Sequence, residues 1–214
     1  MHGAAVGVMA QRPKTAMSHR DPRVARFLEN LVTALATRRM DPGVADAIAR
    51  IQSANESNGV ARSPESFRLP VCQFLARALE AARAASEPIA GVAEALIAIE
   101  PHLQWSRRHG GGPFASDNWL DGHANAMIVG PTGIETCGNL QVGVSLMAPQ
   151  VRYPDHRHAP EEVYVVLSPG RFKHGASSWV EPGIGGMFHN VPNVMHAMAS
   201  DDAPLLAIWS LWDA

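Results

Sequence analysis

The sequence predicts an α+β protein in which a helical first half precedes an antiparallel β-sandwich or small barrel. Up to about residue 105, apolar residues recur every three or four positions, which is the period of an amphipathic helix. Beyond the glycine run at 110–112 they form short runs separated by Gly, Pro and Asn, which is typical of strands. We therefore expect a loose arm, a helical region and a β domain, over residues 1–20, 21–110 and 111–214.

Composition limits the kind of protein and its partners. Of the 214 residues, 46% are hydrophobic and 18% are charged, which favours a packed core over disorder. The formal net charge is −2, and the basic pairs Arg38-Arg39 and Arg107-Arg108 are interpreted as solvated surface. A nucleic-acid partner is therefore not expected.

The sequence favours a cytoplasmic location without a membrane partner. No apolar run reaches the roughly 18–20 residues that a membrane span needs. The short apolar stretch Ala4 to Ala10 has no Lys or Arg before it, so no signal peptide is expected, and Met9 or Met17 are alternative starts. Cys72 and Cys137 match no CxxC spacing and are expected to be free thiols in a reducing compartment.

Four helices are expected in the first half. Asp21-Pro22 is a start signal for a helix over about 22–40, and Asp41-Pro42 repeats that signal for a shorter helix that ends near 55–59. A third helix is expected from Ser63-Pro64 to Leu79, kinked or split by Pro70, and a fourth from Glu87-Pro88 to about Leu103. The glycine run that follows matches no phosphate-binding pattern and is interpreted as a loop.

The second half predicts eight short strands, as in an antiparallel sandwich or barrel. The apolar runs that define them cover about 124–129, 139–148, 162–168, 171–174, 178–181, 186–190, 196–200 and 204–212.

One stretch of this β domain carries metal-binding side chains. His156, His158, Glu162 and Tyr164 occupy even positions, so an extended strand would turn all four toward one face. His196 follows in a later strand. A set of three imidazoles and one carboxylate suits a divalent Zn, Fe, Mn, Co or Ni ion. Chance pairing of surface histidines is the alternative, but Glu162 lies in a strongly apolar strand, where an unpartnered carboxylate would be costly.

These residues resemble the first motif of the cupin superfamily, in which HxH is followed by Glu and then by a glycine. Gly170 stands near that last position. The second cupin motif is matched loosely, because Asn193 replaces its glycine ahead of His196. Asn also tolerates positive φ, so the turn can be kept. The resemblance covers about residues 120–213 and implies a jelly-roll-like cupin barrel behind an N-terminal helical layer.

A narrower resemblance is to the bacterial cupin-type lyases of dimethylsulfoniopropionate (DMSP). It rests on the run YPxHxHxPEExY, on PGIGG at Pro182–Gly186 and on HNxPNxxHAM, together with the helical part at 22–105. The resemblance implies cleavage of DMSP to dimethyl sulfide and acrylate. It also implies Tyr164 as the base and, as metal ligands, His156, His158, Glu162 and His196.

The residue types suit this reaction. A metal that holds the substrate carboxylate would spread the negative charge that develops on the neighbouring carbon. A free tyrosine has a pKa near 10, and a nearby divalent cation would favour its phenolate. The alternative for Tyr164 is a buried tyrosine that only forms a hydrogen bond across the barrel.

Aromatic side chains are candidates to bind the sulfonium group by cation–π contact, although each is also an ordinary packing residue. The substrate-binding candidates are Tyr153, Trp179, Trp209 and Trp212. Tyr153 lies nearest the ligands in sequence and is also able to hold the substrate carboxylate through its hydroxyl group. His123, His174 and His189 are expected near the pocket mouth, without a ligand role.

Two other functions use the same ligand set. One is a cupin dioxygenase with Fe(II), and the other is a non-enzymatic sensor of a metal or small ligand. A lyase needs the base Tyr164, whereas a dioxygenase often uses its metal–oxygen species, and a DNA-linked sensor would need a basic helical face that residues 22–105 lack. The helices are open to two further interpretations, as the interface of a homodimer or as a lid over the barrel mouth.

Overall fold

The computed structural model describes residues 20–56, 59–110 and 112–213, so the expected arm at 1–20 lies outside the described residues except for Arg20. The helices are α1 (Pro22–Ala36), α2 (Val44–Glu56), α3 (Leu75–Arg83), α4 (Glu87–Ile99) and α5 (Trp119–Gly122), with 3₁₀ turns at Pro70–Phe74 and Glu100–His102. Within the described ranges, no helix is both long enough and apolar enough to cross a membrane.

The helix start signals act as expected at α1 but not at the third segment. The Asp21 side chain accepts a hydrogen bond from the backbone N–H of Arg23 at 2.8 Å, which caps α1. The third helix does not begin near Ser63, because Pro70 holds the preceding Leu69 in an extended conformation with φ −90° and ψ 157°. Pro70 therefore opens a 3₁₀ turn that leads into α3, and the segment before it has no helix.

The strands are β1 (Val60–Ala61), β2 (Trp105–Ser106), β3 (His123–Val129), β4 (Glu135–Thr136), β5 (Gln141–Met147), β6 (Glu161–Val166), β7 (Arg171–His174), β8 (Met187–Asn190), β9 (His196–Ala199) and β10 (Leu205–Trp212). Seven of these coincide with expected strands. The expected strand at 178–181 is wrong, because there only Val180 forms a single bridge, to Phe172. Pro182 lacks a backbone N–H and ends the pairing.

Two sheets form the β domain. The larger has the order β1-β4-β3-β5-β10-β6-β8, with β2 also paired to β3, and the smaller is the antiparallel pair β7-β9. Both β1 and β2 come from the predicted helical region, so that region contributes short strands to the edge of the large sheet. Arg20 also joins the two regions through a buried ion pair with Glu135 at 2.6 Å.

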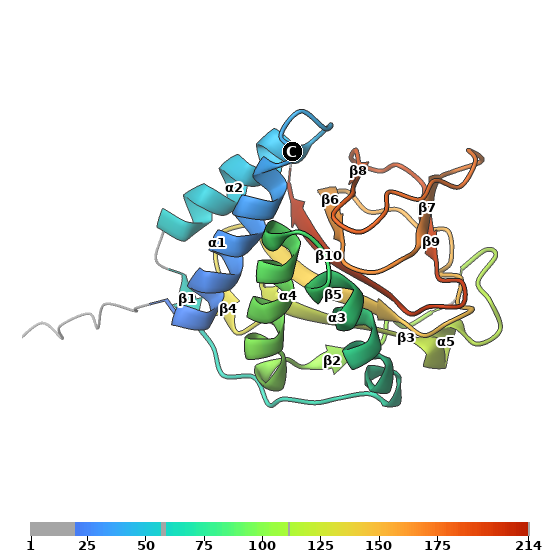
Figure 1. Ribbon diagram of the computed structural model, residues 1–214, viewed down its shortest axis with the longest axis horizontal. Coiled ribbons are helices and arrows are strands. Elements are labelled where there is room, and N and C mark those ends of the chain that lie inside the picture. The colour runs from blue at the N-terminus through green and yellow to red at the C-terminus, as the bar shows by residue number, and fades with distance from the viewer. Residues whose placement is uncertain (1–19, 57–58, 111, 214) are drawn as a thin grey trace, which may run out of the picture.

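The large sheet separates two hydrophobic cores, and side-chain alternation along β6 and β10 assigns residues to each. Val163 and Val165 of β6 face the first core, which they share with the helices α1–α4. Tyr164 and Val166 face the second core, between the large sheet and β7-β9. Helices α1–α4 thus cover the face of the sheet opposite the second core (Figure 1). They are not a lid over that core.

Candidate metal centre

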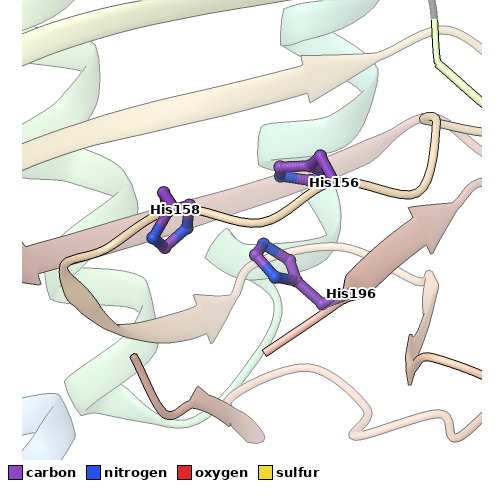
Figure 2. Close-up of side chains that lie close together, drawn as sticks. All are labelled: His156, His158 and His196. Atoms are coloured by element: carbon purple, nitrogen blue, oxygen red, sulfur yellow. The ribbon is translucent and has the colours of Figure 1, made fainter. Parts of the chain in front are cut away.

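Three histidines converge at the edge of the second core. The ligand nitrogens of His156, His158 and His196 all lie within 4.8 Å of one another. His156 and His158 come from the segment between β5 and β6, and His196 is the first residue of β9, so one strand of the small sheet and a connection between two strands of the large sheet contribute (Figure 2). The rings of His156 and His196 are closest, with 4.1 Å between their centroids.

The local structure that brings these rings together differs from the expected strand. Strand β6 begins only at Glu161, because Pro154 and Pro160 cannot donate to a ladder. His156 is instead held by a backbone bridge to His196, with N–H···O distances of 3.0 and 2.9 Å. Convergence therefore comes from the pairing of two segments, not from alternation along one strand.

A turn at Asn193 holds the third histidine. Asn193 has φ 62°, which confirms that it supplies the left-handed conformation in place of glycine. Its backbone N–H donates to the carbonyl oxygen of His158 at 2.9 Å. The loop that leads to His196 is thus tied directly to the residue that bears the second imidazole.

One hydrogen-bond pattern, shared by the three histidines, fixes the tautomer of each ring. Nδ1 of His156, His158 and His196 faces the carbonyl oxygen of Pro154, Pro160 and Val194 at 2.9, 2.8 and 3.0 Å. A carbonyl only accepts, so each Nδ1 carries the proton and each Nε2 presents a lone pair to the common centre. Ligand histidines in metal sites are oriented in this way.

Glu162 adds a carboxylate to two of these rings. Its Oε2 lies 3.2 Å from Nε2 of His158 and 3.4 Å from Nε2 of His196. Both the carboxylate oxygen and the unprotonated Nε2 atoms are acceptors, so they need a cation or a proton between them. Nε2 of His196 is buried and has no hydrogen-bond partner in the described part of the chain. This donor set fits a divalent metal ion.

Asn190 and His174 extend the site behind Glu162. The side-chain amide of Asn190 donates to Glu162 Oε2 at 2.7 Å, and its own oxygen accepts from His174 Nε2 at 2.9 Å. Asn190 is fully buried. Because its two ends are held, its amide orientation is fixed, and it can hold the carboxylate in one position.

The protein's own groups keep two of the rings neutral. Burial lowers the pKa of His156 and of His196 from the ordinary value of 6.5 to about 4. Burial acts in the same direction on His158, but the hydrogen bond and the charge of Glu162 outweigh it and raise the pKa of that ring. Neutral imidazole is the form that binds a metal ion.

Tyr164 is two residues from Glu162 on the same face of β6 and is 4% exposed. Burial raises its pKa well above 10, and the negative charge of Glu162 raises it further. The surrounding protein groups therefore favour the neutral phenol, and a positive charge nearby is needed to favour the phenolate.

A cavity of about 490 Å³ opens onto this centre, and its lining includes His156, His158, Glu162 and Tyr164. Tyr153 and Trp209 also line it, so the structure brings these two predicted substrate-binding residues to the site. Trp209 is opposite Gly143 in the strand register, where an added Cβ would approach the indole ring to 2.2 Å. Glycine at that position therefore makes room for the ring.

The structure does not bring the other two aromatic candidates to the cavity. Trp212 packs in the first core with the helices, because three positions along a strand reverse the side-chain direction. Trp179 is outside, where its ring contacts the cations of Arg152, Arg171 and Lys173 at 5.6, 5.3 and 5.4 Å.

The cavity lining also contains residues that were not predicted as site residues from the sequence: Arg108, Asn125, Met127, Gln141, Ser145, Met198 and Leu211. Arg108 was interpreted as solvated surface, yet it lines the cavity together with Asn125 and Ser145. Asn125 Oδ1 accepts a hydrogen bond from Ser145 Oγ at 2.6 Å. The alternating pattern of β3 and β5 offered a signal for Asn125 and Ser145, whereas the position of Arg108 depends on a loop.

Comparison with solved structures identifies the fold. The DMSP lyase DddQ from Ruegeria pomeroyi DSS-3 is 22% identical, with a TM-score of 0.67 over 90% of this chain and 92% of that one. A chain from the crystal structures of the DMSP lyases RdDddP and RnDddQII is 21% identical, again with a TM-score of 0.67, over 90% and 93%. A search of curated protein sequences finds no significant match.

The helical layer, the two sheets and the histidine cluster together define a cupin-like protein, although the large sheet does not close into a complete barrel. A sequence model of dimethylsulfoniopropionate lyase matches residues 44–207, which is most of the chain. The chain therefore belongs to the DMSP lyase family.

Proposed function

We propose that this protein is a metal-dependent lyase that cleaves DMSP to dimethyl sulfide and acrylate by β-elimination. Membership of the DMSP lyase family supports the substrate and the reaction. The observation that carries the metal dependence is the set of three Nε2 lone pairs directed to one centre, each fixed by an Nδ1–H···O=C hydrogen bond.

The metal ligands in this proposal are His156, His158, Glu162 and His196. A divalent ion there, of the kind Zn, Fe, Mn, Co or Ni, would supply a Lewis acid that binds the substrate carboxylate and stabilises negative charge on the adjacent carbon. The donor chemistry fits such an ion because the rings of His156 and His196 are neutral at Nε2 and the Glu162 carboxylate adds negative charge.

Tyr164 is proposed as the base. Its phenolate oxygen removes the proton from the carbon next to the substrate carboxylate. The electron pair of that C–H bond forms the new C=C bond, and the C–S bond breaks with its electrons going to sulfur. The sulfonium thus leaves as neutral dimethyl sulfide, acrylate remains, and Tyr164 returns the proton to solvent.

Trp209 and Tyr153 are proposed to bind the two ends of the substrate. Trp209 is the register partner of Tyr164 across β10 and β6, so its indole lies beside the base, where it can contact the sulfonium cation. Tyr153 lies against His156, with 5.0 Å between ring centroids, and presents its hydroxyl to the carboxylate side.

The dioxygenase and sensor alternatives use the same ligands but do not require Tyr164 as a base. The deciding experiment is incubation of the purified protein with DMSP and detection of dimethyl sulfide in the gas phase, with and without a chelator. We expect release of dimethyl sulfide that the chelator abolishes and that added divalent metal restores. A metal-loaded protein that releases no dimethyl sulfide would exclude the proposed reaction.

A further inference from the structure

Arg108 is an exposed cation in the lining of the metal-site cavity. Its guanidinium carbon lies 6.0 Å from the centroid of the Tyr153 ring, and its side chain lines the same cavity as Glu162 and Tyr164. Across residues 20–56, 59–110 and 112–213, no carboxylate lies within ion-pair distance of it. Its neighbour Arg107, by contrast, pairs with Asp121 at 3.0 Å.

The backbone under Arg108 is held by a buried histidine. The N–H of Arg108 donates to Nε2 of His123 at 3.1 Å, and Nδ1 of His123 donates to the Trp119 carbonyl at 2.5 Å. The His123 ring stacks on Trp119, with 4.2 Å between centroids, and is 1% exposed. Burial lowers the pKa of His123, which keeps Nε2 available as an acceptor. The position of Arg108 is therefore built into the fold.

Two polar residues of β3 and β5 line the cavity together with Arg108, and an apolar row follows one same-face step along these strands. Asn125 of β3 and Ser145 of β5 are register partners on the cavity face. Two residues along those strands, Met127 pairs with Gly143, which is opposite Trp209. One same-face step along a strand is about 7 Å. The cavity is thus polar and cationic where Arg108, Asn125 and Ser145 line it and aromatic beside Trp209, and beyond Trp209 it is lined by Gln141 and the proposed ligand Glu162.

This polarity matches a zwitterion that carries a carboxylate at one end and a sulfonium at the other. A guanidinium binds a carboxylate through charge-assisted, often bidentate hydrogen bonds, and repels a sulfonium. The indole ring of Trp209 has the opposite preference: its face attracts a cation such as the sulfonium group. We propose that Arg108 is a substrate-binding residue that recognises the carboxylate and sets the direction in which the substrate enters. This inference rests on the proposed function and adds a specificity residue to it.

The inference predicts a defect in substrate binding, not in chemistry. Arg108→Gln should raise KM for DMSP by about 10- to 100-fold, the range that loss of a charge-assisted contact allows, with kcat nearly unchanged. Arg108→Lys keeps the charge but loses the planar fork, so its KM should be intermediate. Arg107→Gln is the matched control, because Arg107 pairs outside the cavity, and its KM should equal that of the parent protein.

Binding of propionate provides a test that does not depend on turnover. Calorimetry on the metal-loaded protein should show that Arg108→Gln weakens propionate binding by a similar factor, while ethyldimethylsulfonium, which lacks a carboxylate, binds no more weakly. Equal propionate affinity in Arg108→Gln and Arg107→Gln would overturn the inference even if DMSP is cleaved. If DMSP is not cleaved but propionate binding still depends on Arg108, the carboxylate site stands and the proposed substrate is wrong.

Discussion

Asn190 and Glu162 form a buried hydrogen bond across β8 and β6, with 2.7 Å between the amide nitrogen and the carboxylate oxygen. The same oxygen faces the lone pairs of His158 and His196. Asn190 therefore determines where the carboxylate stands relative to the imidazoles. Without this bond, the carboxylate would be free to rotate away from the common centre.

Asn190→Leu removes this donor while keeping a similar volume, so Glu162 loses its orientation. Outer-sphere substitutions of this kind usually cost about 10- to 100-fold in metal affinity or activity. We expect a metal dissociation constant raised within that range, measured by competition with a chromogenic chelator. His174→Phe, which removes only the contact to the far end of Asn190, should have a smaller effect. Equal affinities in Asn190→Leu and the parent protein would contradict the role of Asn190.

Tyr164→Phe removes the proposed base and leaves the four ligands in place. We expect dimethyl sulfide release to fall by at least about 100-fold, as for loss of a general base. Elemental analysis should show an unchanged metal content, which separates this effect from a loss of the ion. Near-normal turnover in Tyr164→Phe would show that another group removes the proton.

Glu162→Ala removes the carboxylate that faces His158 and His196. The three neutral imidazoles remain, but without the negative charge the ion binds less tightly. We expect a substoichiometric metal content after dialysis, together with low activity that rises when metal is added in excess. Glu161→Ala is a suitable control, because Glu161 contacts His189 at 2.6 Å instead of the cluster. The proposed ligand set would fail if Glu162→Ala kept the parent metal content.

The pKa shifts of the histidines predict how the metal-free protein responds to acid. Between pH 6.5 and about 4 the unfolded state protonates the rings of His156 and His196, whereas the folded state keeps them neutral. The free energy of unfolding should therefore decrease as the pH falls through that window. The raised pKa of His158 acts in the opposite direction, with a stabilising contribution below its unfolded value.

The measurement is urea unfolding of chelator-treated protein at pH 7.5, 6 and 5. We expect the urea midpoint to decrease toward low pH, and the free energy of unfolding to fall by at most about 3.4 kcal/mol per ring over the whole window from pH 6.5 to about 4. Replacing His156 and His196 together by Gln should flatten this dependence. A midpoint that rises toward pH 5 in the parent protein would contradict the assigned sign.

The sequence predicted the two-part fold and the alternation of β6, because both depend on local periodicity. Val163 and Val165 face the helices and Tyr164 faces the cavity, as a period of two requires. The same rule separates Trp209 from Trp212, which stand three positions apart in β10, so the signal that only the first reaches the cavity was present in the sequence.

Other features of the site depend on contacts between distant segments, which periodicity does not encode. His156 is held by a bridge to a residue 40 positions later, and the two prolines around it interrupt the strand that the even spacing had suggested. Arg108 reaches the cavity because its backbone is tied to His123. A pair of adjacent arginines gives no indication that one pairs with Asp121 and the other faces a cavity.

The backbone bridge between His156 and His196 joins the small sheet to the segment that leads into β6. An ion bound by both side chains would join these two residues a second time, through coordination bonds in addition to the backbone hydrogen bonds. Metal affinity and the cohesion of the two sheets are then thermodynamically linked, so that whatever strengthens one strengthens the other. Loss of the ion should therefore loosen the β7-β9 pair first.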